Sequence, residues 1–213
     1  MKALNLKEFN EFELIDVRAP ELETGEVLVQ VNATGACGSD VHGMDGSSSR
    51  PIPPIVLGHE SAGVITQVGV SVTSWDMGDR VSYDSTISCG QCKFCDLDQV
   101  NLCRKRRLLG VSRDEYRQPG AFTEFVNVPE RILYSIPDSM TFQEAAFCDP
   151  VVVALHAVSR VDVKPGDTAS DFSTPANPNE QSGFCRDGSV RRREIVGRFP
   201  RGHEVARHLI GCR

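Results

Sequence analysis

Residues 89–103 read CGQCKFCDLDQVNLC, and the four cysteines in this stretch are Cys89, Cys92, Cys95 and Cys103. Four thiolates are the usual ligands of a structural zinc ion, which they surround as a closed tetrahedron. Four unrelated buried thiols seldom cluster this densely. A redox pair at Cys92 and Cys95 is the main alternative, but the flanking cysteines favour zinc. The stretch therefore predicts a lobe folded around a structural zinc, with no coordination position left for a substrate.

The composition is that of an acidic protein with enough apolar residues to form a core. Its 213 residues are 40% hydrophobic and carry a net charge of −6. That charge argues against nucleic acid or an anionic membrane as the main partner. The basic run 104–107 would suit a nucleic-acid-binding zinc ribbon, but in an acidic domain a solvated loop is the better interpretation.

No targeting or membrane segment is predicted. No stretch approaches the roughly 18 apolar residues of a membrane span. Residues 1–8 carry charges where a signal peptide is apolar. We therefore expect a cytoplasmic protein. Thiols stay reduced in that compartment, which favours metal binding over disulfides.

Short strands separated by turns are predicted through about Thr168. Residues 26–32 carry valine at every second position, as a half-buried strand does, and residues 64–68 and 122–128 are similar. Many short strands at close spacing predict a mainly β fold with some α, built as a small β-barrel rather than a βαβ array.

Helices are predicted only late in this region. Thr141 and Glu144 have the spacing of a capping box, which marks the start of a helix. After Pro150, residues 151–161 are apolar enough for a largely buried helix.

The last 45 residues differ in composition from the rest. Residues 173–183 are rich in Ser, Pro and Asn, as linkers are. The basic residues after Thr168 are eight arginines and no lysine, with a net charge of +3, whereas the preceding residues carry −9. The change predicts a boundary near residue 168 and a poorly ordered tail, 169–213.

A second, looser group of potential metal ligands consists of Cys37, His59, Glu60 and Asp149. Each alone is a weak signal, because a lone histidine is more often structural and Asp149 before a proline suits a helix cap. Together they offer one thiolate, one imidazole and two carboxylates, a mixed set that leaves room for a substrate oxygen, as a catalytic zinc requires. Either carboxylate is a possible ligand.

Three polar residues near Cys37 are candidates for supporting roles. Asp40 is a candidate acceptor that would fix the ring of His59. Ser39 and His42 are candidates for carrying the proton of an alcohol away from the metal.

In these residues the chain resembles the N-terminal catalytic part of the zinc-dependent medium-chain dehydrogenase/reductase family, above all its sorbitol, threonine and butanediol dehydrogenases. The motifs that carry the resemblance occur in the family's order over residues 1 to about 168. They are Gly35-x-Cys37-Gly38-Ser39-Asp40-x-His42, Gly58-His59-Glu60-x-x-Gly63, Gly78-Asp79-Arg80-Val81, the cysteine quartet, Gly120-Ala121-Phe122-Thr123-Glu124-Phe125, and Asp149-Pro150 followed by Ala154-Leu155-His156-Ala157.

The resemblance implies a GroES-like β-barrel catalytic domain over residues 1–150, with two zinc ions per chain. One zinc would be held by Cys37, His59 and either Glu60 or Asp149, and the other by the quartet in its lobe. It implies a small polyol or secondary alcohol as substrate and NAD or NADP as hydride acceptor in a full-length relative. Nothing in the sequence indicates which alcohol, which of the two cofactors, or which oligomeric state.

The sequence departs from the family pattern in two places. Asp149 stands where the polyol-oxidising branch usually has a longer glutamate. Residues 151–168 match a connecting helix and the start of the nucleotide-binding domain, but no G-x-G-x-x-G follows, so no intact Rossmann domain is expected. We therefore expect a truncated or frameshifted dehydrogenase that is inactive alone. The alternative is a non-catalytic zinc-binding interaction module.

Overall fold

The computed structural model describes residues 1–111 and 117–160. The chain divides into two units, Met1–Val153 and Ala154–Arg213, and the fold below belongs to the first. The predicted poorly ordered tail, 169–213, lies outside the described residues.

Strands predominate among the described residues, as the sequence predicts. The strands are β1 (Lys2–Glu8), β2 (Glu11–Asp16), β3 (Glu26–Gly35), β4 (Ile55–Val56), β5 (Glu60–Val68), β6 (Arg80–Tyr83), β7 (Thr86–Ile87), β8 (Arg107–Leu108), β9 (Phe125–Pro129) and β10 (Leu133–Ser135). The helices are α1 (Gly38–Met44), α2 (Lys93–Asp96), α3 (Phe142–Ala146) and α4 (Cys148–Ser159), with short 3-10 turns η1 (Val100–Leu102) and η3 (Glu130–Ile132).

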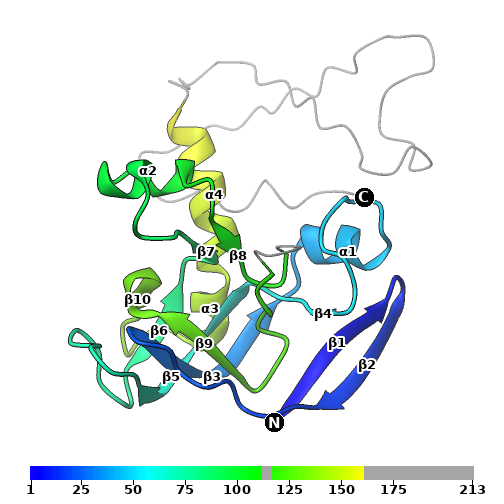
Figure 1. The fold of residues 1–213 in the computed structure, drawn as a ribbon, viewed down its shortest axis with the longest axis horizontal. Coiled ribbons are helices and arrows are strands. Elements are labelled where there is room, and N and C mark those ends of the chain that lie inside the picture. The colour runs from blue at the N-terminus through cyan, green and yellow to red at the C-terminus, as the bar shows by residue number, and fades with distance from the viewer. Residues whose placement is uncertain (112–116, 161–213) are drawn as a thin grey trace. The chain divides into compact units, whose positions relative to one another are not determined.

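The described strands form three antiparallel sheets. The largest has the order β10-β6-β5-β3-β9, a second has the order β2-β1-β4, and β7 pairs with β8. Figure 1 shows the β1–β2 hairpin in dark blue. The three predicted strands correspond to β3, β5 and β9, although β9 begins at Phe125, three residues later than expected. The mainly β fold with some helix is confirmed.

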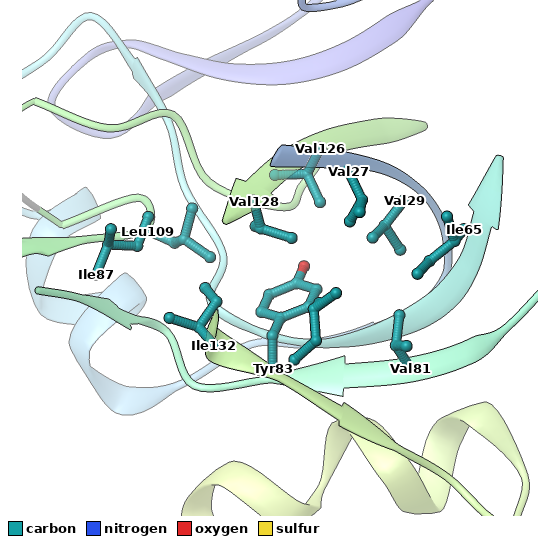
Figure 2. Close-up of a cluster of buried hydrophobic side chains, with 11 residues drawn as sticks. Val27, Val29, Ile65, Val81, Tyr83, Ile87, Leu109, Val126, Val128 and Ile132 are labelled. Carbon is teal, nitrogen blue, oxygen red and sulfur yellow. The ribbon is translucent and has the colours of Figure 1, made fainter. Parts of the chain in front are cut away.

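The main core lies against the five-stranded sheet, where alternate residues of β3, β6 and β9 turn inward. Figure 2 shows the Tyr83 ring among the apolar side chains of this core. Its members include Val27, Val29, Ile65, Val81, Ile87, Leu109, Val126, Val128, Ile132 and Leu133. The Tyr83 hydroxyl pairs with the buried Ser61 hydroxyl, and burial raises the pKa of Tyr83. The pairing matters because a buried hydroxyl without a partner would destabilise the core.

Helix α3 begins at the predicted capping box. The Thr141 hydroxyl accepts a hydrogen bond from the Glu144 N–H at 3.2 Å, and the Glu144 carboxylate accepts one from the Thr141 N–H at 2.9 Å. The helix packs Ala145 and Ala146 beside Ala62 of β5. Small residues on both sides let the helix approach the sheet closely. The position of α3 in turn sets where the chain enters α4, which carries Asp149.

The prediction of a largely buried helix over 151–161 was wrong in two respects. Helix α4 begins at Cys148, so Pro150 occupies its first turn, where a missing N–H costs no hydrogen bond. Its apolar side chains are also exposed, including Val152 (56%), Val153 (64%) and Leu155 (53%). The apolar composition indicated a helix correctly but did not show whether a neighbouring element covers it.

Among the described residues, no helix combines the length and the apolar character needed to cross a bilayer.

Candidate metal centres

The four sulfurs of the quartet converge, as the sequence predicts. Cys89 follows β7, and Cys103 follows η1. Cys92 is the N-cap of the short helix α2, and Cys95 lies within that helix. The Sγ atoms of Cys92 and Cys95 are 3.6 Å apart, and the Cys89–Cys95 and Cys92–Cys103 pairs are each 3.9 Å apart. All four thiols are free.

These distances fit zinc. A tetrahedron with Zn–S bonds of about 2.3 Å has edges of about 3.8 Å, which lies within the observed 3.6–3.9 Å. A disulfide would need sulfurs about 2 Å apart. Because the sulfurs of Cys89 and Cys103 converge on those of Cys92 and Cys95, the redox pair is the weaker interpretation, and the geometry of the donors is that of a closed structural site.

Backbone N–H groups help to hold this cluster of sulfurs. The Cys89 N–H donates to the Cys103 sulfur at 3.4 Å. Hydrogen bonding by the Cys95 N–H lowers the pKa of Cys92. The pKa of Cys89 rises to about 11, because burial and the three neighbouring thiols outweigh a lowering hydrogen bond from the Gln91 N–H. A metal ion binds thiolates, so its binding to this cluster would release protons from the thiols.

The second cluster forms where β3 ends, α1 begins and β5 begins. Cys37 is the N-cap of α1, two residues after the end of β3. Glu60 is the first residue of β5, and His59 immediately precedes it. One ligand atom from each of these three residues lies within 4.8 Å of the others. Cys37 is partly buried, while His59 and Glu60 are each 7% exposed. Burial raises the pKa of Cys37, hydrogen bonds from Ser39 lower it, and Glu60 raises it again.

Asp40 joins the two chain segments that carry these ligands. Its carboxylate accepts a hydrogen bond from the Cys37 N–H at 2.9 Å and another from the Gly58 N–H at 3.1 Å. The Nδ1 atom of His59 is 3.7 Å from Asp40 Oδ1. The carboxylate thus lies near the ring of His59 without a hydrogen bond to it, and it fixes the backbone on both sides of the cluster.

Two buried polar atoms in this region have no hydrogen-bond partner in the structure, His59 Nδ1 and Asp149 Oδ2. Asp149 lies in the first turn of α4, outside the three-residue cluster but close enough for the charge of His59 to lower its pKa. Burial raises the pKa of Asp149, and the Ser85 hydroxyl and His59 oppose that rise. An unpaired buried carboxylate oxygen is costly, and the thiol, imidazole and carboxylate donors of the cluster beside Asp149 are of the kinds that hold a zinc ion.

Ser39 and His42 lie one turn apart on α1. The Ser39 hydroxyl is 3.2 Å from His59 Nε2, on the opposite side of the ring from Asp40. His42 Nδ1 is 3.2 Å from the hydroxyl of Ser47. The structure therefore brings Ser39 to the cluster and places His42 toward the loop that follows α1.

The sequence did not identify two of these neighbours, Ser85 and Ser47. Ser85 follows β6 and reaches Asp149 from 64 positions earlier in the chain, so no local pattern predicts the contact. Ser47 lies in a serine-rich loop that carried no chemical signal of its own.

Residues 23–138 match the family model of the alcohol dehydrogenase GroES-like domain. Sorbitol dehydrogenase of Bacillus subtilis (strain 168) is 34% identical over 171 residues, which are 79% of this chain and 47% of that enzyme. A protein of Sinorhizobium meliloti 1021, described as a zinc-binding dehydrogenase and solved with NADP bound, is 35% identical with a TM-score of 0.68, over 78% of this chain and 47% of that one.

The 2R,3R-butanediol dehydrogenase of Bacillus subtilis is 29% identical with a TM-score of 0.65, over 78% of this chain and 49% of that one. The chain thus spans about half the length of the relatives it matches. The expected GroES-like fold is confirmed, and so is the resemblance that the motifs carried. The chain belongs to the zinc-type medium-chain dehydrogenase/reductase family of alcohol and polyol dehydrogenases, of which it contains the GroES-like domain.

Proposed function

We propose that residues 1–150 form the zinc-binding catalytic domain of an alcohol or polyol dehydrogenase. The observation that carries this proposal is the cluster of Cys37, His59 and Glu60, whose ligand atoms lie within 4.8 Å of one another. A closed structural shell does not explain this mixed set of donors. A catalytic zinc does, because it needs few protein ligands and a free position.

In this proposal Cys37, His59 and one carboxylate hold the metal. His59 binds through Nε2, because Nδ1 faces Asp40, and Asp40 orients the ring. Glu60 is the carboxylate within the cluster, and Asp149 is beside it. When bound, zinc supplies a Lewis acid that favours loss of a proton from the substrate hydroxyl.

Ser39 is the first proton acceptor in the proposed reaction. Its hydroxyl is 3.2 Å from His59 Nε2 and also interacts with Cys37. His42 stands one helical turn further on and is partly exposed. In this proposal the Ser39 hydroxyl takes the proton while passing its own on toward solvent, and His42, whose Nδ1 is 3.2 Å from the Ser47 hydroxyl, is a later acceptor on that route.

The proposal on substrate class and hydride acceptor is supported by the relatives of this chain. Two of the relatives named above are a sorbitol dehydrogenase and a 2R,3R-butanediol dehydrogenase, and a third was solved with NADP bound. We infer a small polyol or secondary alcohol as substrate and NAD or NADP as acceptor. Because the sequence contains no G-x-G-x-x-G turn, we also infer that this chain alone does not turn over substrate.

Metal analysis of the purified chain tests the proposal. We expect two zinc ions per chain for the wild type and one for Cys37→Ser, with folding unchanged by circular dichroism. Cys148→Ser is the matched control, because this free thiol lies outside both clusters, and it should keep both ions. A wild-type chain with a single zinc, lost only on mutation of the quartet, would contradict the catalytic assignment.

A further inference from the structure

Gly35, the last residue of β3, stands directly opposite Glu60, the first residue of β5. The ladder that leads to this pairing has two irregularities, and in the first Thr66 is an extra residue of β5, between the pairs Leu28–Gln67 and Val29–Ile65. Val31 pairs with Gly63, but the next pair is Ala33 with Ala62, so Asn32 is the extra residue of a bulge. A shift of one residue exchanges the two faces of a strand. The extra residue Asn32 of β3 offsets the extra residue Thr66 of β5, so Gly35 meets Glu60 in the same register in which Val27 meets Val68.

The Glu60 side chain occupies the space that a side chain at position 35 would fill. A Cβ atom added to Gly35 would lie 2.6 Å from Glu60 Oε2 and 3.3 Å from Glu60 Cβ. The first distance is well inside van der Waals contact. Any residue other than glycine at position 35 therefore has to displace the Glu60 carboxylate.

The position of that carboxylate matters for the metal cluster. Glu60 meets Cys37 and His59 within 4.8 Å, and it is close enough to Cys37 to raise the pKa of the thiol. We propose that Gly35 is a positioning residue, whose lack of a side chain lets the Glu60 carboxylate lie beside Cys37 and His59 as a metal ligand. This inference rests on the function proposed above and assigns the carboxylate that the sequence left open.

A clash between a side chain at position 35 and Glu60 should weaken metal binding without destabilising the fold. The atom that a Cβ at position 35 would strike is the end of a flexible side chain, which can turn aside at little cost. At Gly63, in contrast, an added Cβ would lie 1.9 Å from the backbone oxygen of Gln30. A backbone atom paired within a sheet cannot turn aside as a side chain can. A substitution at Gly35 should therefore change the metal site and leave the sheet intact.

The experiment compares Gly35→Ala with wild type in the full chain, by competition of bound zinc with a chromophoric chelator. We expect one zinc ion to bind about 10-fold to 100-fold more weakly, the range found when groups that position metal ligands are altered. The quartet zinc and the melting temperature should not change. Gly38→Ala is the matched control, since an added Cβ there has no neighbour within 4 Å, and it should bind both ions as the wild type does.

A double-mutant cycle with Glu60→Ala shows whether Gly35 acts through Glu60. We expect Gly35→Ala to have no further effect on zinc affinity once Glu60 is truncated. An equal loss in both backgrounds, or a drop in melting temperature that persists without Glu60, would mean a structural role and overturn the inference. Wild-type affinity in Gly35→Ala would overturn it too. Absence of the second zinc from the wild type would overturn the proposed function as well.

Discussion

The two cysteine-containing clusters of this protein are assembled in opposite ways. The quartet gathers its four ligands from 15 consecutive residues, with two short helical turns between them. The Cys37 cluster draws on the end of β3, the start of α1 and the start of β5, and Asp149 approaches it from α4. The first depends on local chain geometry, whereas the second depends on the register of the large sheet.

Because of this difference, the two sites depend on metal binding to different extents for their structure. A closed shell of four thiolates contributes its binding free energy to folding of its own lobe. The mixed cluster is placed by hydrogen bonds and strand pairing that exist without the metal, such as those made by Asp40. Substitutions should therefore disturb one site and spare the other.

The largest expected effect follows from Cys103→Ser, at the quartet sulfur that is fully buried. Zinc binding to such a site contributes on the order of 10 kcal/mol in apparent terms, so the lobe over residues 89–108 should unfold. We expect loss of one zinc and rapid cleavage of this lobe in limited proteolysis. The Cys37 cluster should keep its zinc. Simultaneous loss of both ions would show that the two sites are not independent.

A smaller effect, at the other metal site, is expected for Gly63→Ala. The added Cβ would meet the Gln30 carbonyl oxygen at 1.9 Å, beside the bulge between β3 and β5. The two strands must separate there, at a cost of roughly 3 kcal/mol. We expect a lower melting temperature and loss of the Cys37-cluster zinc, with the quartet zinc retained. Retention of both ions would show that sheet register does not set the second site.

The smallest effect is expected for Asp40→Asn. The amide has one oxygen, so it can accept from the Cys37 N–H or from the Gly58 N–H but not from both, as the carboxylate does. Zinc at the Cys37 cluster should bind about 10-fold to 100-fold more weakly, measured by chelator competition. Quartet affinity is the internal reference, and an equal change in both ions would argue against a local role for Asp40.

Much of the fold was predictable because its signals are local. Alternating valines indicated β3, the Thr141–Glu144 spacing indicated the start of α3, and the four cysteines indicated their own cluster. The burial of α4 was mispredicted, because an apolar run of residues does not reveal what packs against it. The contact of Ser85 with Asp149 also had no local signal, since the two residues come from different elements.

The sequence by itself determined the family motifs, the quartet and the donor types of the second cluster, since residue identity and short spacing define all three. Only the tertiary structure decided which donors meet. It placed Glu60 beside Cys37 and His59, and put Asp149 next to His59 but outside the cluster. The reason is the ladder between β3 and β5, in which the extra residues Thr66 and Asn32 offset each other and leave Gly35 opposite Glu60. Strand register depends on contacts far apart in the chain, and a period-2 pattern alone does not specify it.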